Sequence, residues 1–319
     1  MMVVLLAQLA AAQSASESVS DTLEPFNADS FRPAMGPGAL LATESARVPD
    51  QFIARVDLTQ AHNPLIWIDE DGSQLDLIGD AIGIHLGAGR GLGRTQLGIS
   101  APLIRLITSD TEAVPSVMAG DLALSAKYAV LRRDRLALAG IGVLTVPLGA
   151  DIFHLGHDGI SGDLGLAMGG GGEGLAWLTN IAYRIQPSAS LDNAAEALTL
   201  KNAVVVRGGL SLPVGEELAL SGELLTSFIP TDLMAESTPI EVMVGASHQT
   251  REGRLLRGGL GVGIVGAIGA PTWRLMIGIG HDPGAPLILV PEETPLPQQP
   301  LPAEAETRTA PNTTPPVTP

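Results

Sequence analysis

The sequence has no cysteine, few aromatic residues and no long apolar run. Phe, Tyr and Trp make up 3% of its 319 residues. Without Cys there is no disulfide framework, no Cys-based zinc site and no thiol nucleophile. A membrane-spanning helix requires about 20 consecutive apolar residues, and no stretch of that kind occurs. A helical membrane protein is therefore excluded, although 45% of the residues are hydrophobic and mean hydropathy is +0.28.

Basic residues are also scarce and scattered. The chain has 18 Lys and Arg against 34 Asp and Glu, which gives a formal net charge of −16. Proteins that bind nucleic acid usually carry a basic patch or stripe. Because this chain has no basic run, we expect no nucleic-acid partner.

Motifs for catalysis or cofactor binding are missing. The glycines at 169–172 lack the Lys-Ser/Thr of a phosphate loop, and there is no Gly-x-Ser-x-Gly nucleophile elbow. His154, His157 and Asp158, with Asp151 and Asp163 nearby, could ligate a divalent metal, but we favour an ordinary polar loop. We predict no enzyme, no cofactor and no metal site. An active site assembled across strands, as in barrel-embedded lipases, is the weaker alternative.

The two ends of the chain differ from its middle. Residues 3–12 are apolar and end at Ala10-x-Ala12, which predicts a signal peptide over 1–12 with cleavage before Gln13, although no Lys or Arg precedes it. Residues 13–50 are polar with scattered Pro and predict an irregular periplasmic lead-in. Residues 283–319 are dense in Pro, Thr, Glu and Gln, so we expect a disordered tail.

Between residues 51 and 282 the dominant pattern has a period of two, which is typical of strands. One face of each segment is apolar, while the other holds Gly, Ala, Ser and occasional charges. In one example Leu122, Leu124, Ala126, Tyr128 and Val130 alternate with Asp121, Ala123, Ser125, Lys127 and Ala129. A sandwich would have a strongly polar second face. Small residues there favour a barrel wall with its apolar side toward lipid.

Twelve such segments are present, and they predict a closed antiparallel transmembrane β-barrel of about 12 strands over 51–282. We place the strands at 51–62, 74–88, 95–106, 121–131, 136–148, 161–169, 174–186, 198–212, 217–228, 239–249, 254–264 and 271–281. The second segment changes parity, which a bulge near Gly79 or Gly83 would explain. We expect the first strand to pair with the last.

The connections alternate in length and charge. Five long connections hold eleven acidic residues and no Lys or Arg, whereas five short ones hold seven Arg. Barrels of bacterial outer membranes have short periplasmic turns and longer external loops. This alternation predicts an even strand number, with both termini in the periplasm of a Gram-negative cell. Ordinary solvated loop surface explains part of the acidity equally well.

Charged residues fall on the face that the parity turns inward. They are Arg55, Asp57, Asp80, Lys127, Arg184, Lys201, Arg207, Glu223, Glu241 and Arg274. On the lipid face each would cost about 2–4 kcal/mol near mid-membrane, so we predict that these ten residues line a pore. Mixed signs are compatible with a water-filled channel or with a salt-bridged network that closes the lumen. Gly-rich inward rows favour a narrow pore.

Four segments occur in an order that resembles a known family: Ala-His-Asn-Pro-Leu at 61–65, Gly-Asp-Leu-Ala-Leu-Ser-Ala-Lys-Tyr at 120–128, Leu-Thr-Val-Pro-Leu-Gly at 144–149, and Trp-Arg-Leu-Met-Ile-Gly-Ile-Gly at 273–280. Over residues 22–282 the chain resembles the amino-terminal barrel of OmpA-like outer-membrane proteins, and also the transporter-type barrels associated with phenol degradation. The resemblance implies outer-membrane lipid and lipopolysaccharide as neighbours. Because no peptidoglycan-binding domain follows the Pro-rich segment, peptidoglycan binding is not carried over.

Three functions remain open from the sequence. The first is a porin-like passive channel for small solutes, or a structural envelope protein. The second is a transporter of hydrophobic small molecules, which would require an apolar lumen or a plug formed by the lead-in. The third is an exported soluble β-domain that acts as an adhesin or binding module. The inward charges favour the first.

Overall fold

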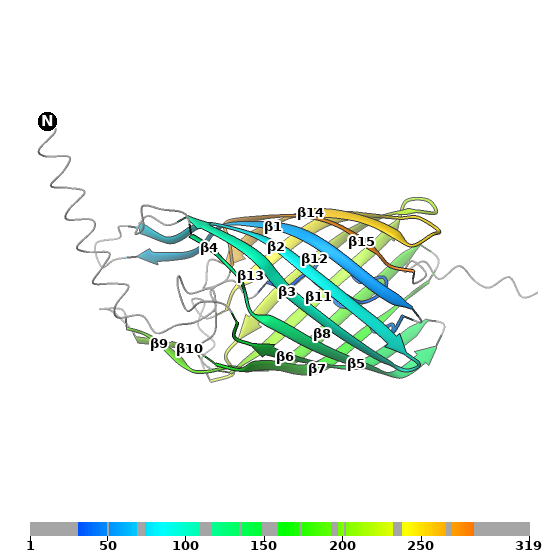
Figure 1. Ribbon diagram of the computed structural model, residues 1–319, viewed down its shortest axis with the longest axis horizontal. Coiled ribbons are helices and arrows are strands. Elements are labelled where there is room, and N and C mark those ends of the chain that lie inside the picture. The colour runs from blue at the N-terminus through cyan, green and yellow to red at the C-terminus, as the bar shows by residue number, and fades with distance from the viewer. Residues whose placement is uncertain are drawn as a thin grey trace, which may run out of the picture. The chain divides into compact units, whose positions relative to one another are not determined.

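The computed structural model describes residues 31–49, 51–68, 74–108, 116–133, 135–148, 159–172, 174–192, 197–200, 202–231, 238–265 and 270–283. These residues form strands joined by turns and irregular segments (Figure 1). In these ranges no helix is long and apolar enough to cross a membrane.

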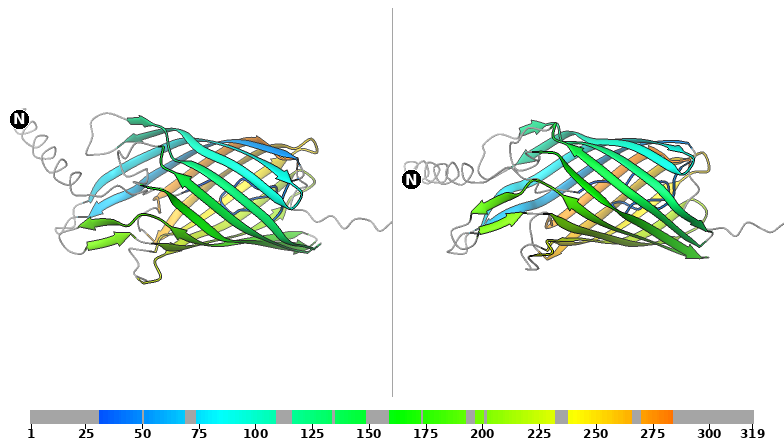
Figure 2. Two further views of the ribbon diagram at one scale, coloured as in Figure 1. Left: turned by 60° about the horizontal axis from the view of Figure 1, so that its bottom comes forward. Right: turned by 90° about the horizontal axis from the view of Figure 1, so that it is seen from below.

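Twelve strands of the described chain form a ring. They are β1 (Phe52–Ile68), β2 (Gln74–Leu92), β3 (Thr95–Thr108), β5 (Leu122–Arg133), β6 (Leu136–Val146), β7 (Ser161–Gly172), β8 (Leu175–Ile185), β11 (Ala203–Pro213), β12 (Leu218–Phe228), β13 (Ile240–Gln249), β14 (Arg254–Val265) and β15 (Trp273–His281). Neighbouring strands are antiparallel, and β1 pairs with β15 from Ala54–His281 to His62–Trp273. The predicted closed twelve-stranded barrel, with its first strand beside its last, is confirmed (Figure 2).

Three short strands lie outside the ring of twelve. β4 (Ser116–Met118) pairs with β3, and β9 (Ala189–Asp192) forms a hairpin with β10 (Ala197–Leu200). Both additions lie in connections that the sequence predicts to be long. The predicted strand over 198–212 is wrong at its start, because residues 197–200 belong to β10 and the barrel strand begins at Ala203.

The irregularity predicted in the second strand is present. The pairing of β1 with β2 shifts between the Leu65–Ile78 and Ile66–Asp76 pairs, and that of β2 with β3 shifts between Ile84 and His85. Asn63 on the opposing strand has a φ of 51°, a conformation that Asn tolerates better than most residues. These shifts reconcile the two parities of the second segment.

Apolar side chains cover the outside of the ring, as the period-two pattern predicts. Exposed positions include Val56, Leu58, Leu97, Ile99, Leu124, Tyr128, Ile181, Tyr183, Leu220, Leu224, Ile277 and Ile279. Successive side chains on a strand point to opposite faces, so the intervening small and charged residues point into the lumen.

The lumen is occupied by residues 31–49, which we call the luminal segment. This irregular stretch precedes β1, and its dark-blue trace runs inside the ring of strands (Figure 2). Ala42 and Thr43 are 0% exposed. Phe31, Leu41 and Ala42 pack with Met243 and Met276 of the wall, and Ala46 packs with Ala139 and Ala167. The sequence alone predicts an irregular segment here and does not place it in the lumen.

Glycines of the wall make room for this segment. A Cβ atom at Gly245 or Gly259 would overlap the side chain of Leu41. The inward glycines, interpreted from the sequence as leaving the lumen open, in part accommodate apolar side chains of residues 31–49.

Candidate functional site

One wall carboxylate binds the middle of the luminal segment. The backbone N–H groups of Leu41, Ala42 and Thr43 donate hydrogen bonds of 2.7, 3.0 and 2.8 Å to Glu223 of β12, and the Thr43 hydroxyl donates a fourth of 2.7 Å. Glu223 is buried. Successive backbone N–H groups that converge on one anion form a concave nest. A buried carboxylate with four donors therefore holds residues 41–43 against the wall.

Two arginines near the short-turn end bind carbonyl groups of the same segment. Arg55 donates to the carbonyl oxygens of Ala34 and Gly36 and to Asp282, the last at 2.9 Å. Arg257 forms a bidentate ion pair with Asp57 at 2.9 and 2.8 Å and also donates to the carbonyl oxygen of Ala34. All four charged side chains are at most 3% exposed. Buried charges require such partners, because an unpaired one would be strongly destabilising.

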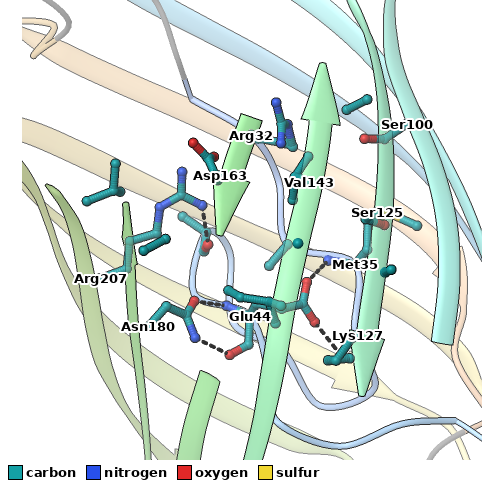
Figure 3. Close-up of a pocket in the computed structure, with 18 of the residues that line it drawn as sticks. Arg32, Met35, Glu44, Ser100, Ser125, Lys127, Val143, Asp163, Asn180 and Arg207 are labelled. Atoms are coloured by element: carbon teal, nitrogen blue, oxygen red, sulfur yellow. Dashed lines mark hydrogen bonds and ion pairs between the residues drawn. The ribbon is translucent and has the colours of Figure 1, made fainter. Parts of the chain in front are cut away.

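A second ion pair holds the segment further along. The Lys127 ammonium donates to the Glu44 carboxylate and to the carbonyl oxygen of Ser45, both at 2.9 Å. The Asn180 side chain makes two bonds to the backbone of Glu44, one accepted from its N–H and one donated to its carbonyl oxygen (Figure 3). Residues 44 and 45 are thereby bound from both β5 and β8.

Further guanidinium groups lie along the rest of the lumen. Arg207 donates to the carbonyl oxygen of Ala42 at 2.9 Å. Arg274 forms an ion pair with Glu241, and its guanidinium carbon lies 4.1 Å from the ring centroid of Phe31, within cation–π range. These contacts bind the start and the middle of the luminal segment to β11 and β15.

The predicted pore-lining residues take several positions. Seven are buried or partly buried in the lumen, in contact with the luminal segment or with a residue that contacts it: Arg55, Asp57, Lys127, Arg207, Glu223, Glu241 and Arg274. Arg184 pairs with Asp163. Asp80 pairs with His62 and shares the outward face of Leu86 on β2, so its predicted inward position is not what the structure shows. Lys201 lies outside the described residues. That they line a conducting pore stays a prediction.

Other luminal residues were not predicted. Arg257 and Asp163 share the inward parity of their strands, since Leu256, Leu260, Leu164 and Leu166 face outward, so the same argument could have found them. Arg32, Glu44 and Asp282 lie outside the strands, where no period exists to indicate a facing. The metal candidates His154, His157, Asp158 and Asp151 lie outside the described residues, and within those residues no group of three potential ligands is present.

Space remains beside the luminal segment. A cavity of about 100 Å³ lies between it and the wall, lined by Arg32, Glu44, Lys127, Asp163 and Arg207 among others (Figure 3). A second, of about 60 Å³, adjoins Phe31, Arg184 and Arg207 toward the connection after β12. A third, of about 40 Å³, lies among the short-turn residues 213–217. The arrangement is a barrel with an occupied lumen that retains polar cavities.

Comparison with known proteins supports the fold. No protein-family model matches this sequence, and no curated protein does. An outer membrane channel from Pseudomonas putida F1 is 15% identical with a TM-score of 0.56, and the match covers 74% of this chain and 97% of that one. The NanC porin is 8% identical with a TM-score of 0.49, over 72% and 98%. A Pseudomonas aeruginosa FadL homologue is 10% identical with a TM-score of 0.45, over 82% and 99%. The likeness to the P. putida channel shows the fold alone.

Proposed function

We propose that this protein is an outer-membrane channel gated by its own residues 31–49. The observation that carries the proposal is the binding of the luminal segment to charged residues on several strands, including Arg55, Lys127, Arg207 and Glu223. A channel that only needed a narrow lumen could be filled by wall side chains. A separate segment held by reversible polar contacts can instead move aside.

The outer face supports a membrane location. Exposed Leu, Ile, Val and Tyr side chains occur on nearly every strand of the ring, and monomeric soluble proteins rarely expose contiguous apolar patches of more than a few hundred Å². A closed barrel leaves no strand edge with unpaired backbone groups, and lipid has no hydrogen-bonding partner for such groups. The exported soluble β-domain is therefore the weakest of the three candidates.

Orientation follows from the connections. We place the long acidic connections outside the cell and the short turns in the periplasm. The start of β1 and the end of β15, both at the short-turn end, are then on the periplasmic side, and residues 1–12 are removed as a signal peptide. The OmpA-like relationship stays a prediction of the same kind.

Transport of hydrophobic small molecules is the second candidate. The occupied lumen favours it, because such a transporter requires a plug or an apolar lumen, and residues 31–49 form a plug. The charged residues around the 100 Å³ cavity count against a wholly apolar cargo.

A reversible cross-link tests the gate. Ala46 of the luminal segment packs with Ala139 and Ala167 of adjacent strands, and the chain has no native Cys. Contacting Ala residues are close enough for a disulfide after substitution by Cys. We expect oxidised Ala46→Cys/Ala139→Cys protein to lose its openings in a planar bilayer and to regain them after reduction.

The matched control is Ala139→Cys/Ala167→Cys, which links two wall strands and leaves the segment free. It should conduct like the unmodified chain before and after reduction. If the first cross-link leaves conductance unchanged, ions pass beside a fixed segment and the gating proposal is wrong.

A further inference from the structure

Three guanidinium groups gather around one carboxylate in the lumen. Asp163 of β7 accepts two hydrogen bonds from Arg184 of β8, at 2.8 and 3.2 Å. Arg32 of the luminal segment and Arg207 of β11 are also close enough to interact electrostatically with Asp163 and with Arg184. Of the three guanidinium groups, only Arg184 donates hydrogen bonds to the Asp163 carboxylate.

The neighbouring carboxylates are already engaged. Glu223 accepts four hydrogen bonds from residues 41–43, and Glu44 pairs with Lys127. The groups that donate to Glu223 are neutral, so its negative charge still acts on Arg207, as does that of Glu44, and Asp121 acts on Arg32. Like charges as close as these guanidinium groups still repel one another, and an anion or water bound between Arg32 and Arg207 would lessen that repulsion.

Arg32 and Arg207 each retain hydrogen-bond donors. A guanidinium group has five N–H donors, yet Arg32 donates to Thr145 and Arg207 to the carbonyl oxygen of Ala42. Within the described residues, none of the other nitrogen atoms of Arg32 and Arg207 is fully buried without a hydrogen-bond partner. The remaining donors of Arg32 and Arg207 therefore face the cavity that both residues line.

The same cavity has an apolar side. Arg32, Asp163 and Arg207 lie at one end of it, and Val143 lies on the strand that crosses it (Figure 3). Ile141 and Pro33 are also in its wall. Arg207 also lines the cavity beside Phe31, near the connection after β12. A solute that enters from the long-connection end would therefore reach the larger cavity on this side.

We propose that this cavity binds a small organic anion, with its carboxylate on Arg32 and Arg207 and its short carbon chain against Ile141 and Val143. Guanidinium groups match a carboxylate in geometry and charge. A cavity of about 100 Å³ suits about four carbons, since cavities of about 150 Å³ hold benzene. The inference adds a solute class to the proposed channel, but binding itself requires no conductance.

The test is calorimetric titration of the full chain in nonionic detergent with butyrate. Butyrate should bind, while 1-butanol and butylammonium should not. Arg207→Gln should weaken butyrate binding about tenfold or more, the effect of one charge-assisted hydrogen bond. The control Arg251→Gln, on an exposed turn, should bind as the unmodified chain does.

Because Arg207 also holds Ala42, a second variant separates ligand binding from loss of the luminal segment. Val143→Phe fills the cavity and leaves all three guanidinium groups in place, and it should abolish butyrate binding in a barrel that keeps its heat-modifiable electrophoretic mobility. Equal binding of butyrate by Val143→Phe would overturn the site. Tighter binding of inorganic phosphate than of butyrate would overturn the organic class. Butyrate binding without conductance would refute the channel and leave the site standing.

Discussion

Glu223→Gln is the substitution that most directly weakens the hold on the luminal segment. It keeps the size of the side chain but removes the charge that attracts the N–H groups of residues 41–43. A Gln carbonyl oxygen accepts at most two of the four present hydrogen bonds, so two donors lose their acceptor. The amide group of Gln also brings its own N–H donors next to the N–H donors of residues 41–43, where it finds no acceptor.

The magnitude follows from those bonds. Hydrogen bonds to a charged group contribute about 1.5–3 kcal/mol each. Loss of two, partly compensated by water, weakens the docked state by about 3 kcal/mol, which corresponds to roughly a hundredfold in the ratio of released to docked segment. The barrel wall should be little affected, because β12 pairs with β11 and β13 through backbone groups and not through the Glu223 side chain.

Single-channel recording in a planar bilayer measures this ratio as open probability. We expect Glu223→Gln to open far more often than the unmodified chain, with the same conductance in the open state. The control is Glu216→Gln on an exposed turn, where the ion pair with Arg251 contributes little, and its open probability should be unchanged. An unaltered open probability in Glu223→Gln, in a folded barrel, would refute the inference that these bonds keep the channel closed.

Three further predictions concern the barrel itself. Leu224→Lys, on the outer face midway along β12, should reduce folding stability in vesicles by about 2–4 kcal/mol, and Val214→Lys on the turn by about 0–1 kcal/mol; equal costs would argue against a lipid-facing wall. On intact cells an impermeant maleimide should label Thr231→Cys but not Arg133→Cys, and the reverse would invert the orientation. Amino-terminal sequencing of the mature protein should begin at Gln13, and a start at Met1 would count against the signal peptide.

The wall of the barrel could be predicted from the sequence because its signal is local. Alternation along each strand predicts which side chains share a face, and the cost of a charge in lipid predicts which of the two faces is the outer one. The outward positions of Leu124 and Tyr128 and the inward position of Lys127 all follow from this rule. The ring closes as expected, and closure pairs the first strand with the last and leaves no strand edge in the ring unpaired.

The contents of the lumen could not be predicted in the same way. Residues 31–49 are irregular, so no period relates Glu44 to Lys127 or Leu41 to Glu223. Their contacts join positions 83 and 182 residues apart, which only the closed barrel brings together. The inward glycines indicate that the wall leaves space in the lumen, but the sequence does not show whether that space is empty or filled by a side chain such as Leu41.

If residues 31–49 leave the lumen when the channel opens, a Cys at position 46 should become accessible to thiol reagents in the open state. Ala46 is 1% exposed, so Ala46→Cys should react slowly with a small charged thiosulfonate in bilayers. Combined with Glu223→Gln, it should react faster in proportion to the rise in open probability. A rate that stays the same while open probability rises would mean that the channel opens with the segment in place, and the account would be wrong.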